Sequence, residues 1–526
     1  MPRLFVSVRT SFRNPSFLLA LAAALIAFAV QSGELGSADT QYRLQATHAL
    51  WTSDPPVLPR DYPEFGIHGR NGTLQTWYGI GQSLLMLPSD IAGTFIQNLP
   101  IFVDYNGNDP SVRTIVVSCT VSIFLNIVTA LVVLRFLLLL GFSRGQSIAG
   151  ALALLLLTTH LHYTQNLMEN NYICVLTLAG FTWQYRWVLT GSRRALVIGS
   201  AAFGLNLLTR LTTGMDLLAG ALFAVLVLWF TGTRGSELFA RAKAYVAVTL
   251  PIYAFFILLD RLYQYFRFGS FFNTYAGIAA REWRAQDHSL PPSFPFSAPF
   301  HSGFFGALFS PAKSIFLFDP LLILMLILAA VAWRRFSPPV KAYAIATAIM
   351  LFACISFYAC YFTFAGDTAW GDRYAATTVE LAALPAVPLM LQLWARLSRS
   401  LRILGVALIA FSALVQIASV AFWQSLERYQ MESLHLSRFV IGLRLENIVA
   451  FALGKMTAWG LINPHITDDA WDYQHITSWN LLPFQLRHAG EAPLWVDRLT
   501  LVLWWASLAA LAWVLLRLRR QLRDAG

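Results

Sequence analysis

The sequence predicts an all-α, polytopic membrane protein, and three observations carry this prediction. Hydrophobic residues make up 57% of the 526 residues and charged residues only 12%, whereas a soluble domain carries about 25% charged residues. The apolar residues gather in runs whose lengths approach the roughly 20 residues that a membrane-spanning helix needs. Basic residues recur in every second connection between these runs, which is the pattern that orients helices in a bilayer.

Twelve apolar segments are predicted to be transmembrane helices. They are residues 16–31, 114–134, 146–164, 171–190, 195–209, 213–230, 244–260, 314–333, 342–362, 375–394, 403–423 and 499–516. We therefore expect about twelve spans, with residues 1–423 forming one transmembrane module. Residues 424–498 are expected to form an extracytoplasmic segment, and residues 499–526 the last helix with a basic tail.

The charge distribution predicts the orientation of the helices. The net charge of +11 would suggest a nucleic-acid partner in a soluble protein, but here the charge is sorted by side, so we predict a lipid bilayer and no nucleic acid as the partner. If the N-terminus is cytoplasmic, both termini are, and the long segments 32–113, 261–313, 363–374 and 424–498 face outside. The cytoplasmic basic residues are Arg3, Arg9, Arg13, Arg135, Arg144, Arg193, Arg194, Arg234, Arg241, Lys243, Arg334, Arg335, Lys341, Arg396, Arg399, Arg402, Arg517, Arg519, Arg520 and Arg523.

Several function classes are disfavoured by what the sequence lacks. It contains no Gly-rich nucleotide-binding motif, which argues against an ATP-driven pump and against an enzyme that uses a cytosolic nucleotide sugar. The four cysteines all fall inside predicted spans. Their spacing suits neither a zinc site nor a disulfide framework, and we expect them to be buried as small hydrophobic side chains.

The two longest outer segments have distinct patterns. The first outer loop, 32–113, contains two stretches that are expected to be helical: residues 40–51 suit a helix lying at the membrane surface, and residues 77–88 suit a second interfacial helix or a re-entrant one. The last outer segment contains Trp459, Trp471, Trp479 and Trp495. Tryptophans at this density favour an interfacial belt or a local core, although they could also stack on sugar rings.

Asp39 is the first candidate catalytic residue, because it follows the first span by eight positions and so lies at the membrane surface. An acid at this position has two interpretations. It either caps the following helix through backbone N–H groups, a role that Ser37 could also fill, or it acts as a general base toward an attacking hydroxyl group. The spacing alone leaves both open.

Glu169 is the second candidate, at the outer turn between two predicted spans, where it faces the same compartment as Asp39. His160 and His162 lie nearby in the sequence. His-x-His at a helix end does not place both rings on one face, and no further ligand follows at close spacing. We therefore expect no metal and no other cofactor; a divalent cation is compatible with these residues but not indicated by them.

Isolated cations on the outer side form a third group. Each stands among apolar neighbours, where a single cation often only extends its charge to the membrane surface. Together, on the side opposite the positive-inside bias, they suit an anionic headgroup such as a phosphate. The candidates are Arg210, Lys313, Arg373, Arg70 and His68.

Four of these features resemble the GT-C superfamily of polyprenyl-phosphate-sugar-dependent glycosyltransferases. They are the outer-loop acid Asp39 with its following helix, the stretch Tyr78 to Pro88, Leu208-Thr-Arg-Leu211, and Leu308-Phe-Ser-Pro-Ala-Lys313 with Trp370-Gly-Asp-Arg-Tyr374. The chain is most similar to the bacterial branch that includes protein O-mannosyltransferases and lipid A aminoarabinose transferases. Two positions depart from the family pattern: Thr40, where members often have Glu, and Leu211, where they have Pro.

The resemblance implies an inverting transferase in a bacterial inner membrane with its active site on the extracytoplasmic side. It implies that a hexosyl or pentosyl group moves from a polyprenyl-phosphate donor to a glycan, lipid or protein hydroxyl. Asp39 would be the acid–base residue and Glu169 a second acid, while Arg210, Lys313 and Arg373 would bind the lipid phosphate. Residues 424–498 would select the acceptor.

Two alternatives remain at this stage. A transporter or flippase of a lipid-linked or polar solute would also be polytopic, although such proteins usually carry repeats and polar groups at mid-membrane, and no repeat is visible here. An inactive relative of the glycosyltransferases would keep the fold without the chemistry.

Overall fold

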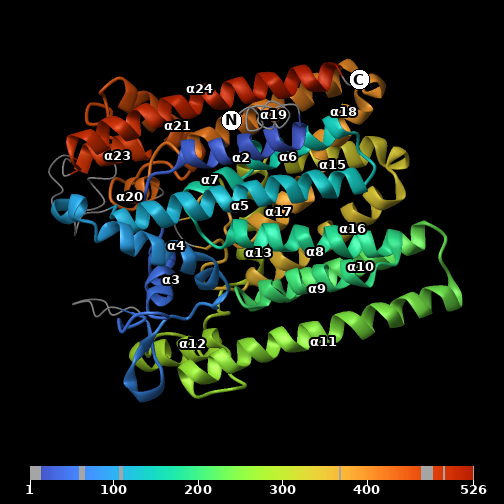
Figure 1. Cartoon of the computed structure of the whole chain (residues 1–526), viewed down its shortest axis with the longest axis horizontal. Coiled ribbons are helices and arrows are strands. Elements are labelled where there is room, and N and C mark those ends of the chain that lie inside the picture. Colours follow the sequence, from blue (N-terminus) through green and yellow to red (C-terminus); the bar gives the residue numbers. More distant parts are fainter. Residues whose placement is uncertain are drawn as a thin grey trace, which may run out of the picture.

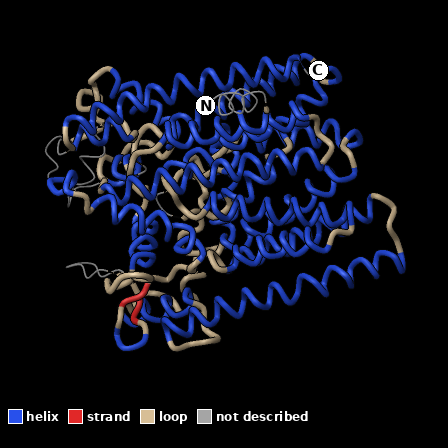
Figure 2. The backbone as a smooth tube through the Cα atoms, viewed as in Figure 1, coloured by secondary structure: helices blue, strands red, loops and turns tan. Residues whose placement is uncertain are grey.

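The structure is a computed structural model. It describes residues 14–57, 66–105, 110–366, 369–423, 425–463, 478–489 and 492–524. Nearly all of these residues are in helices or in the turns between them (Figure 2). Two short strands, β1 (Ile67–His68) and β2 (Leu74–Gln75), pair antiparallel with Ile67 opposite Gln75. The expected all-α class is confirmed.

The long helices run side by side and, together with the short helices α17 (Ala376–Ala383) and α18 (Ala386–Leu393), form one bundle (Figure 1). Its other members are α2 (Pro15–Val30), α5 (Val112–Leu139), α6 (Arg144–Leu157), α8 (Asn170–Thr190), α9 (Arg193–Leu207), α10 (Gly214–Phe230), α11 (Gly235–Phe268), α15 (Leu321–Ala332), α16 (Pro338–Tyr358), α19 (Arg399–Ser419) and α24 (Leu494–Asp524). The shorter elements are α3 (Ala38–His48), α4 (Gly81–Gln97), α7 (His160–Gln165), α12 (Tyr275–Gln286), α13 (Phe300–Phe309), α14 (Ile315–Phe318), α20 (Leu426–Glu432), α21 (Val440–Ala452) and α23 (Leu482–Ala489).

Each of the twelve predicted spans falls on helix, which supports a multi-pass membrane protein. Among the described residues, seven helical stretches are long and apolar enough by themselves to cross a bilayer, and α2 and α6 are shorter apolar helices. Three predicted spans are divided. Residues 146–164 separate into α6 and α7, residues 314–333 into α14 and α15, and residues 375–394 into α17 and α18. The count of about twelve stays a prediction.

Aromatic packing joins the middle of the bundle. Phe136 on α5, Phe181 on α8, Phe223 on α10 and Tyr343 on α16 are fully buried, and their ring centroids lie between 5.0 and 6.4 Å apart. Edge-to-face pairs of this kind add to the van der Waals packing that holds helices together in lipid. These four helices are therefore packed tightly against one another, and the loops at their ends start from fixed positions.

The two ends of the bundle differ. The short basic connections, such as those from α8 to α9 and from α10 to α11, lie at one end, and α3, α4 and α12 lie at the other (Figure 1). The tight connections are closed by serine caps: Ser143, Ser192 and Ser398 accept hydrogen bonds from the first turns of α6, α9 and α19. The sequence-based sorting of long polar segments to one end agrees with this arrangement.

Both predicted surface helices of the first outer loop are present. Residues 40–51 overlap α3, and residues 77–88 overlap the start of α4, which continues through Pro88 to Gln97. In the last outer segment, Trp479 stacks on Phe422 with ring centroids 5.1 Å apart and so belongs to a local core, whereas Trp459 and Trp495 are exposed. Trp471 lies outside the described residues.

Candidate functional site

Helix α3 presents Asp39 and Arg43 on one face, because residues four apart are neighbours on a helix surface. Ser37, not Asp39, caps this helix: its hydroxyl accepts a hydrogen bond from the Thr40 N–H at 3.2 Å. Asp39 lies in the first turn and its carboxylate makes side-chain contacts instead. The capping interpretation of Asp39 is therefore wrong, which leaves its carboxylate available for another role.

The carboxylate of Asp39 is held by two side chains from distant parts of the chain. The Tyr78 hydroxyl donates to Oδ1 at 2.6 Å, and the Arg373 guanidinium donates to Oδ2 at 2.8 Å. Burial acts to raise the pKa of Asp39, but Arg373, Arg43 and the Tyr78 hydrogen bond together lower that pKa below its ordinary value. The Asp39 side chain keeps 24% of its surface exposed, so it is ionised and still accessible.

Glu169 forms ion pairs with two arginines and is more deeply buried than Asp39. It ends the turn before α8, with its side chain only 3% exposed. One oxygen lies 2.8 Å from Arg43, and the other pairs with Arg210. Burial acts to raise the pKa of Glu169, but the charges of Arg43 and Arg210 outweigh it and hold the pKa well below the usual range. Glu169 is therefore a fixed anion between two arginines.

Tyrosine rings support the guanidinium groups. Arg43 lies 4.0 Å above the centre of the Tyr78 ring, and Arg210 and Arg373 lie 5.4 and 5.2 Å from the Tyr374 ring. The Tyr374 ring in turn stacks flat on Tyr358 at the end of α16, with a centroid distance of 4.2 Å. Cation–π contacts of this type stabilise a desolvated guanidinium and fix where its remaining N–H groups point.

We call these residues the arginine cluster: Asp39, Arg43, Tyr78, Glu169, Arg210, Arg373 and Tyr374. Its three arginines face two carboxylates, which leaves one positive charge in excess. Arg210 and Arg373 remain 15% and 13% exposed, although Nε of Arg373 is itself buried and makes no hydrogen bond within the described part of the chain. A guanidinium group that is partly exposed is suited to binding an anion.

Four predicted site residues, Asp39, Glu169, Arg210 and Arg373, are thus brought together from four separate segments. Arg43, Tyr78 and Tyr374 were missed as site residues, although Tyr374 belongs to one of the motifs noted in the sequence. The i,i+4 spacing of Asp39 and Arg43 was a visible signal for the first of them. The position of Tyr78 depends on the tertiary contact between the start of α4 and the end of α9. The sequence pattern does not show this contact.

The other predicted cations lie elsewhere. Lys313 donates to the backbone carbonyl of Ala369 at 2.6 Å, and its charge acts on Asp372, whose pKa burial raises to about 6. His68 binds Glu282 of α12 through its backbone N–H at 2.9 Å and through its ring. Arg70 lies 5.2 Å above the Tyr265 ring. His68 and Arg70 thus fasten the β1–β2 hairpin to α11 and α12.

The histidines considered with Glu169 take up other contacts. Glu169 pairs with arginines, Nε2 of His160 lies 3.0 Å from the Asn126 amide oxygen, and His162 packs against Trp370. These three residues therefore do not form a common metal site. His160 enters a different cluster, described below.

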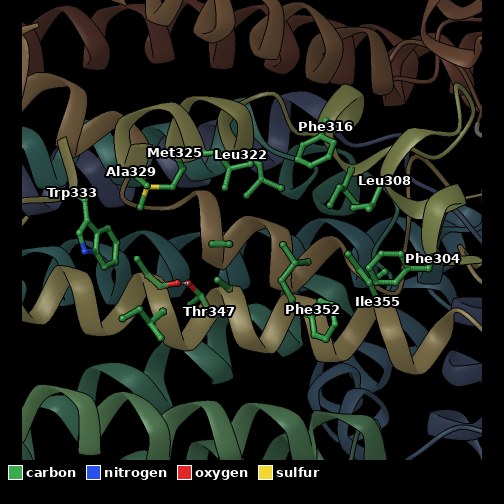
Figure 3. Close-up of a pocket in the computed structure, with 17 residues that line it drawn as sticks. Phe304, Leu308, Phe316, Leu322, Met325, Ala329, Trp333, Thr347, Phe352 and Ile355 are labelled. Atoms are coloured by element: carbon green, nitrogen blue, oxygen red, sulfur yellow. Dashed lines mark hydrogen bonds between the residues drawn. The ribbon is translucent and has the colours of Figure 1, made fainter. Parts of the chain in front are cut away.

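An apolar cavity of about 410 Å³ opens between α13, α15 and α16 (Figure 3). Among the described residues that line it, none is charged, and the cavity extends from Trp333 near the basic end of the bundle to Phe304. Ile355 of α16 lines it, and Tyr358, one turn further along the same helix, packs on Tyr374 of the arginine cluster. Helix α16 thus links an apolar cavity to a cationic site.

Comparison with known proteins finds similarity among solved structures alone. No protein-family model matches the sequence. No curated protein sequence matches it either. Among solved structures, the chain is similar to the apo oligosaccharyltransferase of Archaeoglobus fulgidus, with a TM-score of 0.47, 12% identity, and coverage of 79% of this chain and 58% of that one.

A second similar structure is the archaeal oligosaccharyltransferase AglB of the same organism in complex with an inhibitory peptide and a dolichol-phosphate. Its TM-score is 0.44, its identity 13%, and the coverage is 77% of this chain and 56% of that one. The chain therefore spans less than two thirds of the length of either protein. At this level of similarity nothing about activity or substrate follows for this chain.

Proposed function

We propose that the protein is an inverting membrane glycosyltransferase of the GT-C type that takes its sugar from a polyprenyl-phosphate donor. The observation that carries this proposal is the arginine cluster, in which a partly exposed, ionised acid lies beside an excess positive charge. One group can accept a proton while the other binds a phosphate. Both lie at the bundle end that holds the long polar segments.

The phosphate of the donor is assigned to Arg210 and Arg373. Both guanidinium groups are partly exposed and held in place by an acid and by Tyr374. As the bond between the anomeric carbon and the phosphate oxygen breaks, negative charge develops on the leaving group, and fixed donors stabilise it most at that moment. No nucleotide is needed, because the phosphate already activates the sugar.

Asp39 is assigned as the general base. The acceptor hydroxyl attacks the anomeric carbon from the face opposite the phosphate, its oxygen forms the new glycosidic bond, and its proton passes to a carboxylate oxygen of Asp39. A single displacement of this kind inverts the configuration. The low pKa of Asp39 keeps it ionised, so proton transfer follows as the hydroxyl becomes more acidic during attack.

Glu169 is assigned a positioning role as the second acid. It is nearly fully buried and shared by Arg43 and Arg210, so it aligns the two arginines and compensates part of their charge. Breaking a buried ion pair by removing one partner is strongly destabilising. Glu169 is therefore needed to keep Arg210 oriented toward the donor phosphate.

The apolar cavity along α16 supports a lipid-linked donor. Its wall is built from leucine, phenylalanine, methionine and alanine side chains, including Leu308, Met325 and Phe352. Such a wall suits a hydrocarbon chain, and α16 leads from it to the arginine cluster. We place the site on the extracytoplasmic side of a bacterial inner membrane, with acceptor selection by residues 424–498.

The test is transfer by the purified protein in liposomes that contain labelled polyprenyl-phosphate sugars, with acceptors taken from the cell envelope. We expect covalent transfer with inversion at the anomeric carbon. Movement of the labelled lipid across the bilayer without any covalent product would contradict the proposal and favour a flippase. Mass spectrometry of envelope glycans after deletion of the gene identifies the sugar and acceptor.

A further inference from the structure

A second polar cluster lies inside the bundle and is not explained by the proposed function. It joins His160 at the start of α7, Cys174 in the second turn of α8 and Glu380 in α17. All three side chains are completely buried. One nitrogen, sulfur or oxygen atom from each lies within 4.8 Å of the other two.

The hydrogen bonds around His160 fix which ring nitrogen carries the proton. Asn126 donates its amide N–H to the carbonyl of Ala23 at 3.5 Å, which directs its Oδ1 toward Nε2 of His160 at 3.0 Å. Because an amide oxygen only accepts, Nε2 must donate. The Nδ1 atom of the neutral ring then presents a lone pair. A histidine whose outer nitrogen donates to a neighbouring oxygen is the usual form of a metal ligand.

That lone pair faces another acceptor. Nδ1 of His160 lies 3.9 Å from Oε2 of Glu380, and neither atom makes a hydrogen bond within the described residues. The Cys174 thiol lies beside the same carboxylate and interacts with it as a hydrogen-bond donor, so its single proton does not serve Nδ1 of His160. Two buried acceptors directed at each other repel unless a cation or a proton lies between them.

A second buried carboxylate, that of Asp319, lies close to Glu380 and adds further hydrogen-bond acceptors to the cluster. The Thr159 hydroxyl lies 3.1 Å from Oε1 of Glu380 and also 3.1 Å from Oδ2 of Asp319, so these two oxygens share its single proton, whereas the Thr159 N–H donates to Asp319 alone at 2.8 Å. Within the described ranges, no lysine or arginine forms an ion pair with either acid. A buried carboxylate without a partner cation is costly.

From this geometry we infer that His160, Cys174 and Glu380 bind a divalent transition-metal ion of the zinc type. Imidazole nitrogen, thiolate sulfur and carboxylate oxygen are all ligands that Zn²⁺ binds in proteins, and three such ligands leave a fourth position for a small ligand such as water. Binding releases the thiol proton to solvent. A doubly positive ion with one thiolate and one carboxylate makes a neutral buried unit.

The inferred ion would stiffen the base of the arginine cluster, and the inference does not depend on the proposed function. Helix α8 begins directly after Glu169, and α17 begins three residues after Arg373. Asn170 already joins these two segments by donating to the Arg373 carbonyl at 2.7 Å. A metal ion bound between α7, α8 and α17 would connect α8 and α17 a second time, one helical turn further into the bundle than the Asn170 hydrogen bond.

The experiment uses the full-length protein purified in detergent after zinc exposure and dialysis. Elemental analysis should find about one zinc per chain in the wild type and in Cys354→Ala, a matched control at another buried cysteine, and much less in Cys174→Ala. Cobalt substitution should give a thiolate-to-cobalt charge-transfer band that Cys174→Ala abolishes and Cys354→Ala keeps.

A supporting variant leaves all three ligands in place. Asn126→Leu should weaken zinc affinity by about 10- to 100-fold, as loss of an outer-shell partner does. The inference is overturned if the wild-type protein holds no zinc and binds no cobalt, which would mean that a shared proton joins His160 and Glu380. It is also overturned if the cobalt band survives in Cys174→Ala.

Discussion

Arg210 and Arg373 each use part of the guanidinium to hold an acid and leave part of it exposed. If these exposed donors bind the lipid phosphate, Arg210→Ala and Arg373→Ala should each weaken binding of polyprenyl phosphate by about 1.5–3 kcal/mol, the value of a hydrogen bond to a charged group. The dissociation constant in detergent micelles measures this. Arg428→Ala, at an exposed arginine paired with Glu432, is the control and should leave affinity unchanged, whereas unchanged affinity in both site variants would contradict the assignment.

The pKa of Asp39 predicts a direction for the effect of pH on stability. A carboxyl whose pKa is lower in the folded state adds stability above its unfolded pKa, and this stability is lost as the pH falls through the folded pKa. The difference in melting temperature between the wild type and Asp39→Asn should therefore stay constant from about pH 8 to about pH 5. It should shrink only below about pH 4, near and under the ordinary value of aspartate. A difference that already declines near neutral pH would show that Asp39 is not held by Arg373.

Site residues were predictable from the sequence where a charged residue stands among apolar ones. Asp39, Glu169, Arg210 and Arg373 are isolated charges at the ends of apolar runs, and their expected side of the membrane put them together. Arg43 and Tyr78 look like ordinary surface-helix residues, because only tertiary contacts direct them to Glu169 and Asp39. His68 and Arg70 matched the same pattern, but they attach the β1–β2 hairpin to α12 and α11.

Among the elements, the contact between α4 and α9 sets the position of Tyr78. Gly79 lies so close to α9 that an added Cβ would be 2.3 Å from the carbonyl oxygen of Leu208. Gly79→Ala should therefore force the segments apart, destabilise the protein by about 1–3 kcal/mol and reduce transfer by moving Tyr78 away from Asp39. Thermal unfolding and initial rates measure the two effects.

Gly214→Ala is the matched control, since this glycine starts α10 near the same site and an added Cβ would meet no atom within 4 Å. It should leave both stability and rate unchanged. Equal effects of the two substitutions would show that the close approach of α4 and α9 is unimportant.

Helices were predicted well because their apolar runs are long, but the breaks inside the runs were not. In the run 146–164, the first helix ends at Leu157, and the Thr159 N–H shortly after it donates to Asp319 at 2.8 Å. Asp319 is 160 residues away in the sequence, so no local sequence pattern predicts the end of this helix. Pro320 and Pro385 mark the other two breaks, and prolines are a signal that local reading can use.

For the whole molecule, the charge sorting predicts which end of the bundle faces outside. Ser53→Cys lies in the first outer loop and Ser236→Cys at the start of α11, and both positions are exposed. A membrane-impermeant maleimide should label Ser53→Cys in intact cells, and Ser236→Cys only after permeabilisation. The reverse result would invert the topology and place the arginine cluster on the cytoplasmic side.

The most direct test of the glycosyltransferase assignment compares sugar transfer by the wild type and Asp39→Asn in liposomes that contain a polyprenyl-phosphate sugar. Asp54→Asn, at an exposed acid of the same outer loop, is the control. We predict that Asp39→Asn lowers the rate of transfer by about a hundredfold or more while donor binding persists, and that Asp54→Asn transfers normally. Full transfer by Asp39→Asn would show that Asp39 is not the base.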